Sequence, residues 1–298
     1  MATVKWVDDY FDNGERTVLT SAELSVDGLQ VFGRHYVTKA IPALNSHYHE
    51  NCFEFTYISK GNSTFWVDNH EYKLSGGDVF FTFPDEVHST GSVPLSVNEM
   101  YWFQLDVSNF RHFLFLGNDW AKELIQRLRS IQSRVIKTDN TEMKSLIKGC
   151  FSLFNSRQHD QRYEATCLLL VFLHKLLKYD KEVQFKYTPD IAKAMDYIIA
   201  NLYEEISLDY LACLSGLSLS RFKQKFKEQI GVTPREFINF RKVEIAKNML
   251  LLGQPVTSIA MELGFATSNY FAVVFRRFTT YSPTEYINLY SDLPKIEL

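Results

Sequence analysis

An internal repeat in the last hundred residues limits this chain to folds that contain one small helical motif twice. Nine positions match at a constant offset of 49, and they are Phe222, Phe226, Lys227, Thr233, Pro234, Glu236, Phe237, Ile238 and Asn239 against Phe271, Phe275, Arg276, Ser282, Pro283, Glu285, Tyr286, Ile287 and Asn288. Upstream, the offset is 48, for Leu211, Ala212, Gly216 and Leu217 against Ile259, Ala260, Gly264 and Phe265. One residue has therefore been inserted or deleted between the two parts of the motif.

Each copy has the residue order of a helix-turn-helix. A short helix is predicted over 208–215 and again over 257–263, and each contains a small alanine where two helices cross closely. Gly216 and Gly264 supply the left-handed turn that ends these helices. A second helix then begins with residues that can cap its free N–H groups, namely Ser218 and Ser220 in one copy and Thr267, Ser268 and Asn269 in the other.

The second helix of each copy has an inner apolar face and an outer polar face. Phe222 with Phe226, and Phe271 with Phe275, lie four residues apart and anchor the inner face. The outer faces then carry Arg221, Lys223, Gln224 and Lys227 in the first copy and Ser268, Asn269, Ala272, Val273 and Arg276 in the second. Residues 234–252 read as one long helix with proline in its first turn and Gly253 after its end, so its length fixes the distance between the copies.

The charge distribution favours nucleic acid as the partner of this half. The whole chain has a formal charge of -3, yet residues 217–281 contain ten Lys or Arg and four Glu, a local charge of +6. Basic residues at this density can neutralise phosphates, and the outer side chains could reach base edges in the major groove. An ordinary helical bundle with solvated charges is the alternative for either copy alone, but two copies in register favour the helix-turn-helix.

Residues 190–290 resemble the DNA-binding domain of the AraC/XylS family of bacterial transcription regulators. The matching residues are Arg241, Ala246 and Leu250, then 259–265 (IAMELGF), Tyr270 and Phe271, 275–277 (FRR) and 282–286 (SPTEY). The resemblance places base-reading positions on Ser220, Lys223 and Gln224 and on Ser268, Asn269, Ala272 and Val273, with Arg276 and Arg277 as basic residues. Ala272 and Val273 offer only apolar contact, for example to a thymine methyl, so discrimination between sequences rests mainly on the first helix.

The N-terminal half has a different pattern. From about residue 16 to 107 the chain alternates short runs rich in Val, Thr, Phe, Tyr and Trp with Gly, Asn, Pro and Asp, which predicts many short antiparallel strands. After residue 119 the spacing becomes helical, with amphipathic helices expected around 120–128, 146–154 and 165–177. The polar stretch 179–189 has no periodicity and is predicted to be a linker.

Three histidines and a glutamate in the strand region form a candidate ligand set. His47 and His49 share one face of a strand, Glu54 follows after a turn, and His88 comes about 34 residues later behind a Gly-Asp pair. These are plausible ligands for zinc, iron, nickel or manganese. The arrangement resembles the two motifs of a cupin barrel, although Phe83 and Asp85 depart from the second motif. The histidines could instead bond an organic ligand or simply end strands.

Aromatic side chains near this set could line a pocket for a small molecule. The candidates are Tyr57, Trp66, Phe81, Tyr101 and Trp102. Flat rings stack on sugar faces, and His or Glu accept hydrogen bonds from hydroxyl groups, so the proposed ligand-binding residues are His47, His49, Glu54, Trp66, His88 and Trp102. For any single ring, a place in the core is the alternative. His88 and Trp102 lie at positions that resemble effector contacts in sugar-sensing relatives.

These patterns together predict an α+β chain with four parts. They are a cupin-like effector-binding barrel (1–118), a helical dimerisation and linking segment (119–178), a linker (179–189) and an all-α domain with tandem helix-turn-helix units (190–298). The family resemblance implies a homodimer that binds promoter DNA and a small effector, such as a sugar, and that contacts RNA polymerase to control carbohydrate genes. Core packing against the barrel is the alternative role of the helices in 119–178.

Other classes of protein fit the sequence less well. Four scattered cysteines argue against a disulfide framework, and the longest purely apolar run, 168–173, is too short to cross a membrane, so we expect a cytoplasmic protein. A metal-dependent cupin enzyme, an isomerase or dioxygenase fused to a helical module, is the main alternative to a non-enzymatic regulator. A helical half that recognises protein partners is a third option.

Overall fold

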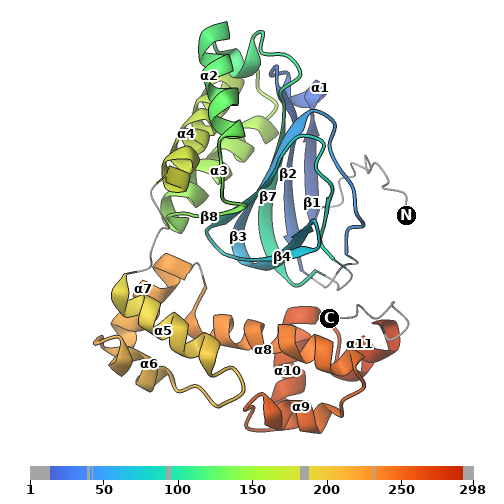
Figure 1. The fold of residues 1–298 in the computed structure, drawn as a ribbon, viewed down its shortest axis with the longest axis vertical. Coiled ribbons are helices and arrows are strands. Elements are labelled where there is room, and N and C mark those ends of the chain that lie inside the picture. Colours follow the sequence, from blue (N-terminus) through green and yellow to red (C-terminus); the bar gives the residue numbers. More distant parts are fainter. Residues whose placement is uncertain are drawn as a thin grey trace. The chain divides into compact units, whose positions relative to one another are not determined.

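The computed structural model describes residues 14–38, 41, 43–91, 95–181, 188–230 and 232–290. The chain divides into two compact bodies. The N-terminal body comprises Met1–Val37, Ala43–Val93 and Asn98–Phe185, and the C-terminal body comprises Thr38–Pro42, Pro94–Val97 and Lys186–Leu298. The first is an antiparallel sheet with helices and the second is helical, so the expected fold class is confirmed (Figure 1).

The sheet of the N-terminal body is antiparallel throughout. Its strands are β1 (Arg16–Thr20), β2 (Leu29–Val37), β3 (Cys52–Val67), β4 (His70–Ser75), β5 (Asp78–Thr82), β6 (His88–Ser89), β7 (Asn98–Asp106) and β8 (Val135–Lys137), and a short helix α1 (Ser21–Leu24) follows β1. The order is β1-β2-β7-β3-β5-β8. The long strand β3 pairs with β7 and β5 along its first half and with β4 and β6 along its second half.

Alternation along these strands separates an apolar face from a polar one. Phe55 of β3 lies opposite Phe81 of β5 and Phe103 of β7, and all three are buried in one core cluster. The rings of Phe55 and Phe103 stack with centroids 5.0 Å apart. The residues that alternate with these phenylalanines along β3 and β7 point to the other face of the sheet, where Glu54 lies opposite Gln104. We call the face that carries Glu54 and Gln104 the inner face.

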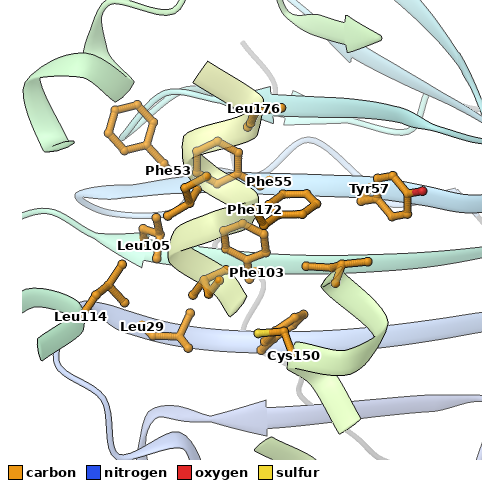
Figure 2. Close-up of a cluster of buried hydrophobic side chains, with 14 of the residues drawn as sticks. Leu29, Phe53, Phe55, Tyr57, Phe103, Leu105, Leu114, Cys150, Phe172 and Leu176 are labelled. Atoms are coloured by element: carbon orange, nitrogen blue, oxygen red, sulfur yellow. The ribbon is translucent and has the colours of Figure 1, made fainter. Parts of the chain in front are cut away.

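Helices cover the apolar face. A 3-10 turn (Phe113–Phe115) leads into α2 (Asn118–Arg129), α3 (Asn140–Asn155) and α4 (Gln161–Lys181). Figure 2 shows Phe172 of α4 between Phe55 and Phe103, in the core cluster that also contains Leu176 of the same helix. These helices therefore pack on the core of the sheet, which was the alternative role expected for them. A role in dimerisation stays a prediction. The predicted linker starts inside α4, and its residues 182–187 lie outside the described part of the chain.

The core also decides the role of three candidate pocket rings. Tyr57, Phe81 and Tyr101 are buried in the cluster beneath the helices, and the Tyr57 hydroxyl donates to the Asn140 side chain at 2.7 Å. The alternative of a core position is therefore confirmed for these three. Their burial follows from the same alternation that directs their neighbours to the inner face.

The C-terminal body contains the two repeats as the sequence predicts. Its helices are α5 (Pro189–Ala200), α6 (Leu208–Leu214), α7 (Leu219–Ile230), α8 (Pro234–Leu251), α9 (Val256–Glu262), α10 (Ser268–Thr279) and α11 (Pro283–Tyr290). Gly216 and Gly264 have positive φ, at 65° and 62°, in the turns before α7 and α10. None of the described helices of the chain is both long and apolar enough to span a membrane.

A close backbone contact holds the two repeats together. A Cβ placed on Gly264, in the turn before α10, would lie 2.3 Å from the carbonyl carbon of Glu204, which precedes α6. Lys242 of α8 is only 3% exposed, and its Nζ donates to the Glu204 carbonyl at 2.6 Å and lies 5.4 Å from the centre of the Phe265 ring. The connection between α5 and α6 therefore packs against the turn of the second repeat, with the side chain of Lys242 beside it.

We expect Gly264→Ala to destabilise the C-terminal body more than Gly216→Ala does. Both substitutions place a Cβ in a left-handed turn, at a cost of about 1–2 kcal/mol. Only Gly264 lacks space, because nothing lies within 4 Å of a Cβ on Gly216. The additional overpacking should cost about 1–3 kcal/mol more, measured as the free energy of urea unfolding. Equal losses in the two variants would contradict the close contact.

Candidate functional sites

The outer face of α7 is polar and exposed. Phe222, Phe226 and Ile230 bury its opposite side in the core of the first repeat. The five residues of this helix that the sequence predicts to contact DNA are all exposed, and they are Ser220, Arg221, Lys223, Gln224 and Lys227. Gln224 donates to the Glu228 carboxylate at 2.8 Å, which orients its amide along the helix.

Helix α10 repeats this arrangement with different chemistry. Thr267 caps the helix by accepting from the Tyr270 N–H at 3.0 Å, and Phe271 and Phe275 are fully buried. Of the predicted outer residues, Asn269, Val273, Arg276 and Arg277 are exposed, and Ser268 and Ala272 are half-buried. Val273 is 67% exposed, so its side chain is accessible to a partner.

Burial removes part of the basic charge that the sequence assigns to this region. Lys242 and Lys247 are 3% and 2% exposed, and Lys247 pairs with Glu244 at 2.6 Å. Lys225 pairs with Asp190 at 2.6 Å. These three cations serve the fold of the C-terminal body, so fewer than ten basic residues face outward.

A hollow of about 230 Å³ lies between the start of α8 and the side of α10. Its lining residues are Thr233, Arg235, Glu236 and Asn239 from α8 and its cap, and Tyr270, Val273, Val274 and Arg277 from α10. The Glu236 carboxylate accepts from the Arg277 guanidinium at 3.1 Å and from the Thr233 N–H at 3.1 Å. Glu236 thus joins the first turn of α8 to helix α10.

The structure brings the predicted histidines and glutamate together on the inner face. His47 and His88 face each other in an isolated β-bridge, and the ligand atoms of His47, His49 and His88 all lie within 4.8 Å of one another. Glu54 Oε2 is 3.0 Å from His49 Nε2, and Glu54 Oε1 is 3.4 Å from His88 Nε2. All four side chains are buried. We call these four residues the histidine cluster.

Backbone contacts fix the orientation of two of the rings. His47 Nδ1 lies 2.7 Å from the Asn45 carbonyl, and His88 Nδ1 lies 3.0 Å from the Glu86 carbonyl. A ring that donates from Nδ1 to a carbonyl presents an unprotonated Nε2, as histidine ligands of metals do. The buried Nε2 of His88 faces the Glu54 carboxylate, with Oε1 3.4 Å away.

Charges within the histidine cluster are strongly coupled. Burial alone would raise the pKa of Glu54, but the imidazoles of His49 and His88 hold it well below its usual value. Burial, together with the neighbouring His88, lowers the pKa of His47. For His88, burial acts to lower the pKa, but the hydrogen bond and charge of Glu54, together with the neighbouring Glu86, outweigh burial and raise the pKa. One carboxylate among three imidazoles favours a bound cation or a proton at this position.

Trp102 lies on the inner face of the sheet, two residues along β7 from Gln104. Trp102 is opposite Thr56 on β3 and Gly33 on β2, and its indole covers Gly33, where a Cβ would lie 2.3 Å from the ring. The Arg16 guanidinium lies 5.5 Å from the centre of the Trp102 ring. Trp66 packs against Gly91 instead.

Sequence reasoning missed several residues of the inner face. Gln104 Nε2 donates to the Glu54 carboxylate at 3.0 Å and lies 3.2 Å from a nitrogen of His49. Gly33 provides the space for Trp102, and Arg16 lies beside that ring. Alternation along residues 98–106 indicates that Gln104 and Trp102 share a face, but the register that aligns them with Glu54 is not visible in the sequence.

Two family models match the chain. The AraC-like ligand-binding domain matches residues 42–173, and a helix-turn-helix domain model matches residues 211–288. The HTH-type transcriptional activator RhaR of Escherichia coli O9:H4 (strain HS) is 25% identical over 306 residues, covering 95% of this chain and 96% of RhaR. An HTH-type transcriptional regulator of Staphylococcus aureus (strain MSSA476) is 23% identical over 241 residues, which cover 77% of this chain. The chain spans only 30% of the length of that regulator.

Two solved structures are also similar at low identity. The C-terminal domain of AraT, a response regulator from Geobacillus stearothermophilus, is 22% identical and covers 38% of this chain and 96% of its own, with a TM-score of 0.34. ToxT from Vibrio cholerae, with bound unsaturated fatty acid, is 16% identical and covers 96% of this chain and 99% of its own, with a TM-score of 0.33. Similarity at this level adds no functional argument.

We expect His35, opposite Arg16 in the register of β1 and β2, to make the N-terminal body sensitive to acid. Burial and the Arg16 cation lower the pKa of His35 from 6.5 to about 4. The unfolded state then binds more protons between these two values, so the folded state loses stability as the pH falls through this interval. His35→Gln should remove this loss. Urea unfolding at several pH values measures it, and parallel pH profiles for both proteins would contradict the assignment.

Proposed function

We propose that this chain is a helix-turn-helix transcription regulator of the AraC family, in which α7 and α10 read two adjacent major-groove segments of promoter DNA. The observation that carries this proposal is the matched pair of helices, each with a buried phenylalanine face and an outer face of the predicted residues. Adjacent segments on one face of DNA are about 34 Å apart. We favour this function over the alternative from the sequence, a metal-dependent enzyme fused to a helical module.

The two helices contribute differently to recognition in this proposal. In α7, Lys223 and Gln224 offer donors to base edges, whereas Val273 of α10 offers an apolar surface that suits a thymine methyl. Ser220, Ser268, Asn269 and Ala272 complete the two base-facing sets. The remaining outer cations contact phosphates, which fix the position of the protein on the duplex without selecting sequence, and they are Arg221, Lys227, Arg276 and Arg277.

We expect the double substitution Lys223→Ala with Gln224→Ala to abolish sequence-specific binding. The lost bidentate contacts should cost about 1–3 kcal/mol for each base pair that they read, while phosphate contacts persist. Gel shifts with the DNA upstream of the protein's own gene, with and without competitor DNA, separate the two kinds of binding. Lys193→Ala, on the exposed side of α5, is the control for loss of a cation. Unchanged specificity in the double variant would rule out α7 as the main reading helix.

We further propose that the inner face of the sheet binds the small effector. Trp102 provides a ring for stacking, and the histidine cluster with Gln104 provides polar groups close by. This combination suits a sugar, whose faces are apolar and whose rim carries hydroxyl groups. The proposal includes a cytoplasmic homodimer formed through the helices of 119–178, because two linked copies raise the effective concentration at paired DNA sites. Contact with RNA polymerase and control of carbohydrate genes remain part of this proposal.

A divalent metal in the histidine cluster is a second proposal for the same face. His47, His49 and His88 supply three nitrogen donors, Glu54 supplies an oxygen donor, and the Nδ1 contacts of two rings set the orientation of their Nε2 atoms. Such a donor set suits zinc, iron, nickel or manganese. A bound metal would supply a Lewis-acidic contact for a hydroxyl or carboxylate of the effector.

We expect the protein to bind about one equivalent of Co²⁺, seen as d–d absorption in the visible range, after removal of metals with a chelator. His49→Ala and Glu54→Gln should each weaken this binding at least about tenfold, since second-shell changes alone cost that much. His70→Ala, at an exposed histidine on β4, is the matched control and should leave binding unchanged. Equal Co²⁺ binding by all variants would exclude the cluster as the metal site.

A further inference from the structure

We propose that the hollow between α8 and α10 seats the phosphate backbone of DNA where a strand passes from one major-groove segment to the next. The inference rests on the proposed DNA-binding function and extends it to residues that the sequence does not assign to DNA. Arg235 and Tyr270 become DNA contacts in this proposal, and Glu236 becomes a positioning residue.

The residues that line the hollow come from the chain segment just after α7 and from α10, the two proposed reading helices. Helix α7 ends at Ile230 and α8 begins at Pro234, so the Thr233–Asn239 side of the hollow directly follows the first reading helix. The other side is α10, the second reading helix. A duplex that presents successive major-groove segments to α7 and α10 must pass its backbone between them.

The lining offers cations and hydrogen-bond donors. Arg235 is exposed, and no ion pair joins it to a carboxylate in the described part of the chain. Arg277 is the second guanidinium, and the Tyr270 hydroxyl and the Asn239 amide can also donate to phosphate oxygens. The volume of 230 Å³ is several times the roughly 30 Å³ that one water molecule occupies in the liquid, so a phosphodiester group has room.

The one acidic side chain of the lining is already neutralised. Glu236 receives hydrogen bonds from the Arg277 guanidinium and from the N–H and hydroxyl of Thr233. These contacts offset the negative charge of Glu236, and the ion pair holds the Arg277 side chain beside the hollow. Repulsion between Glu236 and a phosphate is reduced accordingly.

The repeat shows that these cations belong to the space between the reading helices and not to the motif itself. At the offset of 49, Arg235 corresponds to Thr284, and Arg277 corresponds to Glu228. The residues that build the fold match at the same offset, as Phe226 and Phe275 do. A protein with two helix-turn-helix repeats has one point where the DNA backbone passes between its reading helices. Arginines occur at that point, and the corresponding positions of the other repeat carry none.

The test is the salt dependence of DNA binding by the full chain. The probe is a fluorescent duplex carrying the DNA upstream of the protein's own gene, titrated from low to moderate salt. Arg235→Gln should make the slope of log K against log salt shallower by about 0.9, which is about 3.5-fold less loss of affinity over a fourfold rise in salt. Arg235→Lys should restore the slope. Lys193→Gln, which removes the same charge from α5, should leave it unchanged.

The possible results separate this proposal from the general one. If the wild-type chain binds DNA and Arg235→Gln has the wild-type slope, the hollow does not seat a phosphate, and the assignment of α7 and α10 stands. A slope reduced equally by Lys193→Gln would also overturn the proposal, because the effect would then be one of net charge. If the wild-type chain binds no duplex DNA at any salt concentration, the proposed function itself fails.

Discussion

The backbone of Gly264 lies against the backbone of Glu204, and this contact determines how the two helix-turn-helix repeats are arranged. No side chain fits between them, since a Cβ on Gly264 would lie 2.3 Å from the Glu204 carbonyl carbon. Lys242, buried in the long helix α8, adds a hydrogen bond to that carbonyl and a cation–π contact to Phe265. Helix α8 alone fixes a distance, whereas this contact also fixes an angle. The two repeats are therefore joined at two places, by α8 and by this backbone contact.

In the N-terminal body, the two faces of the sheet have different roles. Because side chains alternate, strands that give Phe55 and Phe103 to the core must give Glu54 and Gln104 to the opposite face. Helices α3 and α4 cover the apolar face, and we place the proposed effector on the opposite, inner face. The histidine cluster and Trp102 occupy that face, and a ligand that favours one arrangement of the body would bias the regulator by its differential affinity.

Much of this could be predicted from the sequence because local patterns carry it. The repeat placed α6 to α11, and the spacing of His47, His49, Glu54 and His88 indicated a common site. Facts that depend on tertiary packing could not be predicted. Lys242 and Lys247 count among the ten basic residues of 217–281, yet both are buried, since helix periodicity does not show which neighbours cover a lysine.

Strand register limits prediction in the same way. The sequence proposes both Trp66 and Trp102 as ligand-binding residues, but pairing between distant strands places Trp102 opposite Thr56 and Trp66 opposite Ser89. The sequence indicates only a turn for Gly264, as for Gly216. Its close contact with the backbone of Glu204, which lies 60 residues earlier in the chain, depends on tertiary packing.

The most direct test of a rigid two-helix reader is selection of bound duplexes from a random DNA pool by the full chain. The account predicts two short conserved blocks whose centres are separated by a constant interval of about 10 base pairs, one turn of the duplex. A single block, or two blocks whose separation varies from one selected duplex to the next, would contradict it.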